Sequence, residues 1–287
     1  MRYRNNSAPA FRRATAQRGY SLIELSVAML IALFLLAGFL TVLQGTRRTS
    51  LSQSSLAQLQ DDERIAMTMI TSVVEMAGYY PDAQATDVQA AFRAAAPFGT
   101  DGQVVFGAAN TTAAFGDVLV VRYNAGANQD VINCQGTSNG ANGTAVAYTN
   151  EFAVQQADPN SPPYLACSTD GGKTFVKLVN NVTKLQVDFG INSTATEDNA
   201  FGKPVDGYVG ITDPNAPSMA NAVAAAAAQV PPVPQWTNVY SVKVQVTFVN
   251  PLYQPIPNQP PAPGQKPTVI FTRVIGLMSR VGVDVNT

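Results

Sequence analysis

The longest apolar run of the chain follows its first twenty residues. Leu25–Leu43 consists of Leu, Ile, Val, Ala, Met and Phe, interrupted by one Ser, one Gly and one Thr. At ~1.5 Å per helical residue, roughly 20 such residues cross the ~30 Å hydrocarbon core of a bilayer. No proline interrupts the run. The pattern predicts a single transmembrane helix that begins near Ser21 and lies in the membrane over about residues 24–43.

A second helical pattern continues beyond the apolar run. From Ser50 to Ala77 there is neither Pro nor Gly, and apolar residues recur at spacings of three, four and seven, which is typical of one buried helix face. Gly78 and then Pro81 form a C-terminal stop signal. We therefore expect one helix over about Ser21–Ala77, whose second half packs on another surface. The stripe comprises Leu56, Leu59, Ala66, Met69, Ile70, Val73 and Ala77.

After Tyr80 the pattern changes to short runs with a period of two. The clearest is Tyr240–Val249, where apolar and polar residues alternate from Tyr240 to Phe248. One apolar face per strand indicates an antiparallel sheet covered on one side, and the helix stripe is its natural cover. The predicted fold class is therefore α+β. The other predicted strands are Asp117–Tyr123, Glu151–Val154, Tyr164–Ser168, Lys173–Val179, Val182–Phe189 and Thr268–Val281.

Three stretches show neither period and are predicted as loops. They are Asn124–Asn150, Asn192–Asn215 and Pro251–Pro267, the last with seven prolines. Asn221–Gln229 fits either a short helix or a low-complexity linker. Trp236, the one tryptophan, is more typical of a packing anchor than of a ligand platform.

The basic residues are distributed unevenly. Met1–Gly19 contains five of the 18 basic residues and no acid, whereas Arg47 and Arg48 follow the apolar run. The positive-inside rule places the N-terminus in the cytoplasm. The remaining chain has 13 basic and 19 acidic residues, a net charge of −6. That mildly acidic balance argues against general nucleic-acid binding.

Candidate catalytic chemistry is sparse. The chain has no histidine, which excludes Ser-His-Asp and Cys-His catalysis and most zinc sites. No phosphate-binding glycine motif occurs, and Asp170, Asp188 and Asp213 do not have the spacing of a calcium loop. We therefore expect no catalytic residue, no metal and no cofactor, and a membrane-tethered enzyme is disfavoured.

The two cysteines, Cys134 and Cys167, lie in the part of the chain beyond the membrane segment. In an exported domain such a pair indicates one disulfide. Two free thiols are the alternative.

Glu24 is the one charged residue between Arg18 and Arg47. A carboxylate at the lip of an apolar helix is unfavourable unless something neutralises it. One interpretation places it in the headgroup zone near the positive helix N-terminus, and the other comes from the residues around it. The string Gly19–Leu25 (GYSLIEL), after a basic leader and before an apolar run, resembles the class III signal of type IV prepilins. The usual family form has Phe where this chain has Tyr20.

The resemblance implies specific processing and assembly roles. Prepilin peptidase would cleave between Gly19 and Tyr20, and the new amino group of Tyr20 would be methylated. Glu24 would then pair with the N-terminal ammonium of a neighbouring subunit, since each charge alone is unfavourable in a low-dielectric site.

The segment after the membrane run resembles the PilW family of minor pilins. Leu56–Gln60, Arg64–Ala66 and Met76–Tyr79 follow that family's order of motifs. Weaker matches follow at Gly116–Tyr123, at the two cysteines and at Leu178–Val187. The resemblance implies a pilin-like fold: a leader over 1–19, an N-terminal helix over 20–78 and a periplasmic β-rich domain over 79–287.

The implied function is a minor pilin at or near the tip of a type IV pilus, where it primes or promotes assembly. The implied partners are other minor and major pilins, the inner-membrane assembly platform and prepilin peptidase, with a large tip adhesin from family context. The implied location is the inner membrane, single-pass with the C-terminal domain periplasmic, and then the pilus. A minor pseudopilin of a type II secretion system is the alternative, followed by a DNA-uptake or adhesion module with an unidentified ligand.

Overall fold

The computed structural model describes residues 19–83, 86–140, 143–192, 205–211, 235–253 and 266–280. Residues 1–18 of the predicted leader over 1–19, the stretch Asn221–Gln229 and most of Pro251–Pro267 lie outside these residues. The chain divides into two compact units, Met1–Gln53 and Ser54–Thr287, and each is described by itself.

The helix α1 (Leu22–Glu75) runs for 54 residues without a break, as the sequence predicts. Its hydroxyl groups bond back to the helix, where the Oγ1 atoms of Thr41, Thr46 and Thr49 donate to carbonyls three or four residues earlier, at 2.7–3.1 Å. An apolar segment without water needs such internal partners for its polar groups. Gly38 and Gly45, which disfavour helix by about 1 kcal/mol each relative to Ala, remain helical.

The first unit contains the apolar half of α1, residues 22–53. Every residue in it is exposed, and its apolar side chains bury nothing within the chain. It contains a window with a mean hydropathy of 2.6, long and apolar enough to cross a membrane by length and composition. We refer to residues 22–53 as the apolar half.

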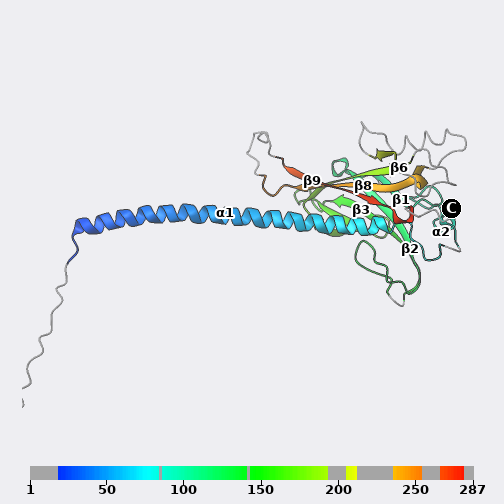
Figure 1. Cartoon of the computed structure of the whole chain (residues 1–287), viewed down its shortest axis with the longest axis horizontal. Helices are drawn as coiled ribbons and strands as arrows, with labels where there is room; N and C mark the ends of the chain where they lie inside the picture. Colours follow the sequence, from blue (N-terminus) through cyan, green and yellow to red (C-terminus); the bar gives the residue numbers. More distant parts are fainter. Residues whose placement is uncertain are drawn as a thin grey trace, which may run out of the picture. The chain divides into compact units, whose positions relative to one another are not determined.

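Residues 54–75, the packed half of α1, belong to the second unit. The apolar stripe predicted from the sequence is present, but the buried residues differ from it at a few positions. Met67 and Val74 are fully buried, whereas Leu56 is 38% exposed and Met69 only partly buried. Figure 1 shows this cyan end of α1 beside the strands of the unit. Its buried residues are Leu59, Ala66, Met67, Ile70, Val73 and Val74.

The described strands form two antiparallel sheets (Figure 1). The five-stranded sheet has the order β1-β2-β3-β4-β5, and the four-stranded sheet has the order β7-β6-β8-β9. The first contains β1 (Val105–Ala109), β2 (Asp117–Ala125), β3 (Val146–Gln155), β4 (Tyr164–Ser168) and β5 (Val176–Asn180). The second contains β6 (Val182–Ile191), β7 (Gly207–Gly210), β8 (Val239–Val249) and β9 (Thr268–Gly276).

The prediction of a single sheet is therefore wrong, although the α+β class is confirmed. Both sheets and the packed half of α1 contribute to one hydrophobic core. Alternation within a strand identifies its buried face but not the sheet to which the strand belongs. Short elements complete the unit: α2 (Val88–Ala91), η1 (Ala113–Phe115), η3 (Gln235–Asn238) and η4 (Met278–Arg280).

Most predicted strands are present, and two observed strands were missed. The prediction for β4 matches residue for residue, and β2, β5, β6 and β8 differ from theirs by a few residues at an end. Strand β3 begins at Val146, inside the stretch predicted as loop, because it pairs with β2 as far as Ala125. Strand β9 ends at Gly276, before the predicted Val281. The missed strands are β1, and β7 in the predicted loop Asn192–Asn215.

The two sheets meet at Gly116 and Asp117. Gly116 forms a parallel bridge with Leu185 of β6, and at its φ of +84° a side chain would collide with the Leu185 carbonyl. The Asp117 carboxylate accepts the Val187 N–H at 2.8 Å. Trp236 packs on Phe106 of β1 and edge-on against Phe189 of β6, with ring centroids 5.5 and 5.1 Å apart. It therefore joins the sheets as a packing anchor.

Candidate functional site

The predicted cleavage point lies just before α1. Gly19, Tyr20 and Ser21 are not helical, and α1 begins at Leu22. Tyr20 is 85% exposed, and no atom lies within 4 Å of the position of a Cβ on Gly19. The peptide bond between Gly19 and Tyr20 is therefore in accessible, non-helical backbone, the state in which a peptidase can bind it.

Glu24 lies in the first turn of α1, four residues after Tyr20. The turn's unpaired N–H groups favour a negative charge at this end of the helix. The Glu24 side chain is exposed, and among the described residues the ion pairs are Arg64–Asp61, Arg93–Asp101 and Lys243–Asp188. The chain thus leaves the Glu24 carboxylate open to a charge from outside.

Cys134 and Cys167 form a disulfide with a Cα–Cα distance of 6.2 Å. Both residues are fully buried. Cys167 belongs to β4, and the Cys134 N–H donates to Asn150 Oδ1 of β3 at 2.8 Å. The bridge therefore fastens the loop after β2 onto the five-stranded sheet. It lies in a different unit from Gly19, Tyr20 and Glu24.

The segment Met76–Tyr79 connects the end of α1 to strand β2 within the second unit. The Gly78 N–H donates to the Arg122 carbonyl at 3.0 Å, and the Tyr79 carbonyl accepts the Asn124 N–H at 2.8 Å. Gly78 has a φ of +75°, and a Cβ there would lie 2.6 Å from Ser279 Oγ. That Oγ donates to the Ala77 carbonyl at 2.6 Å. Glycine is required at the point where the chain leaves the helix.

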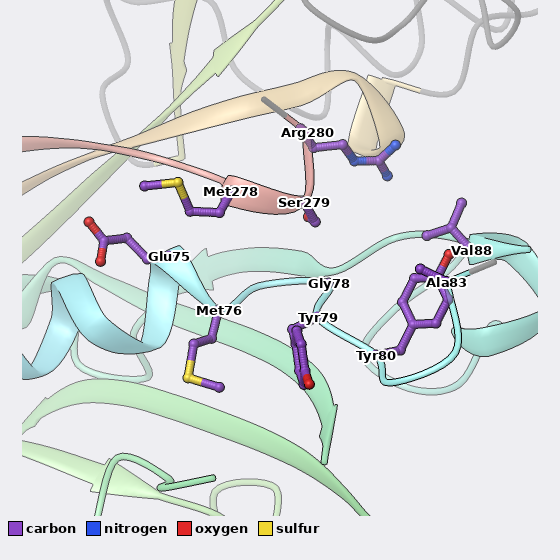
Figure 2. Close-up of a pocket in the computed structure, with 10 residues that line it drawn as sticks. All are labelled: Glu75, Met76, Gly78, Tyr79, Tyr80, Ala83, Val88, Met278, Ser279 and Arg280. Atoms are coloured by element: carbon purple, nitrogen blue, oxygen red, sulfur yellow. The ribbon is translucent and has the colours of Figure 1, made fainter. Parts of the chain in front are cut away.

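A pocket of about 530 Å³ adjoins this segment. Figure 2 shows Met278, Ser279 and Arg280 along one side of the pocket and Tyr79 with Tyr80 on the other. Arg280 is buried, its Nη2 donates to the Gly102 carbonyl at 3.0 Å, and burial lowers the pKa of its guanidinium. The groups around the pocket hold the fold together and present no nucleophile next to a base.

Sequence analysis missed a buried arginine in β2. Arg122 donates to the carbonyls of Gln103, Arg93 and Phe92 at 2.6, 2.7 and 3.1 Å. Its guanidinium lies 4.2 Å from the centroid of the Phe98 ring, and burial lowers its pKa to about 10. These contacts tie the segment before β1 to the sheet. A charged residue inside the apolar run DVLVVRY was the available signal.

The described residues contain no group of three or more His, Cys, Asp or Glu side chains arranged to hold a metal ion. The residues that sequence analysis singled out thus fall into two places: Gly19, Tyr20 and Glu24 at the start of α1, and the disulfide in the β-rich unit.

Comparison with known proteins matches the start of the chain to a family. Residues 15–40 match the prokaryotic N-terminal methylation motif. No curated protein matches the chain. Among solved structures, a type IV-like pilin from Thermus thermophilus is similar over 79% of this chain and 98% of its own, with 10% identity and a TM-score of 0.36. A TM-score of this size does not establish a shared fold.

The matched motif covers Gly19, Tyr20, Glu24 and most of the apolar run. Together with the apolar helix found among the described residues, the motif fits a membrane-anchored, pilin-like subunit. The chain therefore carries a prepilin N-terminal methylation motif at the head of a helix whose apolar half is exposed on all sides among the described residues.

Proposed function

We propose that this chain is a minor pilin of a type IV pilus, cleaved between Gly19 and Tyr20, methylated on Tyr20 and incorporated at or near the pilus tip. The observation that carries the proposal is the apolar half of α1. All of its residues are exposed, and its segment Leu25–Leu43 is almost entirely apolar, so this half needs lipid before assembly and other apolar helices afterwards. The β-rich unit then faces outward.

Glu24 supports assembly rather than simple anchoring. A plain anchor does not require an ionisable residue in its first turn, because the charge opposes membrane insertion even where the helix N-terminus favours it. A carboxylate without a partner among the described residues, four positions after a new N-terminal ammonium, suits pairing between subunits. The partners are other pilins, the inner-membrane assembly platform and prepilin peptidase, with a tip adhesin as a further candidate.

The test is the variant Glu24→Ala in cells that assemble the pilus. We expect unchanged or improved membrane insertion, since a charge is removed from the helix, together with strongly reduced recovery in sheared pili. Asp158→Asn is the control, because it also removes one exposed carboxylate but lies in the β-rich unit, outside the apolar half. Recovery of Glu24→Ala at the level of the control would refute the pairing role.

A minor pseudopilin of a type II secretion system is the second candidate. It is favoured by the same N-terminal motif, which both classes of subunit share. Its test is co-purification of the chain from cells that retain only one of the two systems.

A further inference from the structure

The outer face of the five-stranded sheet carries a trough that the proposed function leaves unused. It has a volume of about 670 Å³ and is lined by residues of β1, β2 and β3. The segment with Pro97 forms one rim, and the β4–β5 turn with Phe175 forms the other. Every residue that lines it is described by the structure.

The floor of the trough is apolar and follows the register of the sheet. Phe106 of β1 pairs with Val120 of β2, and Ala108 pairs with Val118. Val120 is 3% exposed and Ala153 of β3 is 1% exposed. The rims thus shield an outer face that would otherwise lie open to water.

One carboxylate faces this apolar floor. Glu151 of β3 pairs with Val120 in the sheet register and is half-buried. No hydrogen bond or ion pair of its carboxylate occurs among the described residues. Burial, together with the neighbouring Asp170, raises the pKa of the Glu151 carboxyl. A half-buried carboxylate that is not paired with a cation has lost part of its hydration without an electrostatic gain that offsets the loss.

The β4–β5 turn lies close to the Glu151 carboxylate, and glycine is required at this approach. A Cβ on Gly172 would lie 3.0 Å from both oxygens of Glu151, and the φ of Gly172 is +79°. Asp170 is already engaged, because its Oδ1 accepts from Ser168 Oγ at 2.7 Å and from the N–H groups of Lys173 and Thr174 at 3.1 and 2.9 Å. Glu151 is therefore the carboxylate free to bind.

We propose that the trough binds a lysine or arginine side chain carried on an extended segment of another protein chain, with the cation on Glu151 and the segment lying along β3. The lining residues of β3 run from Thr149 to Gln155 at alternate positions, which spans roughly 20 Å at ~3.3 Å per residue. This length matches an extended segment of about six residues. The apolar floor accommodates the aliphatic stem of the cationic side chain.

The test is calorimetric titration of the full mature chain in lipid nanodiscs. The probes are the blocked pentapeptide Ala-Val-Lys-Val-Ala, its norleucine analogue and n-butylammonium chloride. We expect the lysine peptide to bind at least about tenfold more tightly than the norleucine peptide, since a charged hydrogen-bonded pair is worth about 1.5–3 kcal/mol. Butylammonium should bind more weakly than the lysine peptide, because it lacks the backbone that lies along β3.

Three variants localise the binding. Glu151→Gln should weaken the binding of the lysine peptide by at least about tenfold and leave the binding of the norleucine peptide unchanged. Ala108→Leu, which fills the floor, should abolish binding of both peptides. Asp158→Asn, at an exposed carboxylate, should change nothing.

The melting temperature of Glu151→Gln should not fall at pH 7, because the substitution removes a charge that burial disfavours, so that lost binding cannot be attributed to unfolding. The absence of heat with the lysine peptide would overturn the proposal. Equal binding of the lysine and norleucine peptides, or full binding by Glu151→Gln, would overturn the role of the cation. Equal binding of butylammonium and the lysine peptide would overturn the role of an extended segment.

Discussion

The two halves of α1 belong to one unbroken helix but meet different surroundings. In residues 54–75 the apolar side chains form a stripe that is buried in the core, whereas in residues 22–43 they cover all sides and stay exposed. A one-sided stripe fits a partner within the chain, and an all-round apolar surface fits lipid or several helices. Helical periodicity therefore predicts the helix in both halves, but the width of the apolar face tells which half needs an external partner.

The comparison is tested most strongly by a matched pair of isoleucines. Ile70 in the packed half is fully buried, and Ile31 in the apolar half is 54% exposed. We expect Ile70→Ala to lower the free energy of unfolding of the β-rich unit by about 2–5 kcal/mol, because it leaves a cavity. Ile31→Ala should change this energy by less than about 0.5 kcal/mol. Denaturant unfolding of the full chain in micelles measures both, and equal effects would contradict the division.

Removal of the disulfide should affect one region only. The bridge links residues 33 positions apart, and a loop of this size is worth at most about 4 kcal/mol of stability from loop entropy. Replacing Cys134 and Cys167 with serine should therefore destabilise the β-rich unit toward urea. Cleavage after Gly19 and membrane insertion should remain as in the wild type, as immunoblots of membrane fractions would show. A loss of cleavage would mean that the regions are coupled.

Two neighbouring carboxyls in the β-rich unit should respond to pH with opposite signs. Hydrogen bonds from Ser168 and from the backbone lower the pKa of Asp170 below its usual 3.8. Its contribution to stability is therefore present above about pH 4 and lost as the pH falls toward the lowered pKa. Burial raises the pKa of Glu151 above 4.5, so its protonated form favours the fold below that pH, and this contribution is lost as the pH rises through the raised pKa.

The two substitutions at these carboxyls should change the melting temperature only slightly, but in opposite directions at pH 7. Asp170→Asn should lower the melting temperature at pH 7 and lower it by less at pH 2, where part of the contribution is already lost. Glu151→Gln should raise the melting temperature at pH 7 and have no such effect at pH 3. Thermal unfolding followed by circular dichroism at these pH values measures both, and the same sign at pH 7 would contradict the assignment.

The elements with a strong internal pattern could be predicted from the sequence. The helix and β8 were predicted because apolar residues repeat at 3.6 or at 2 over many positions. Strand β1 has the sequence VFGAA and β7 the sequence GYVG, which contain too little alternation to stand out. These segments are strands because β2 and β6 offer them partners.

The candidate sites also differ in how far the sequence alone predicts them. Gly19, Tyr20 and Glu24 are consecutive or nearly so, and their order carries the signal by itself. The trough is lined by residues of three strands, β1, β2 and β3, and by the β4–β5 turn. This turn lies more than sixty positions after β1 in the sequence. Glu151 stood in a short predicted strand, and nothing in its neighbours along the chain indicates that Val120 and Gly172 lie beside it.

The central claim is that the apolar half of α1 is freed by cleavage before Tyr20 and becomes covered by other subunits. N-terminal sequencing and intact mass of the chain recovered from sheared pili test this most directly. We predict a terminus at Tyr20 that carries one added methyl group, with no trace of residues 1–19. An intact Met1 terminus in the recovered chain, or absence of the chain from pili of cells that express it, would contradict the account.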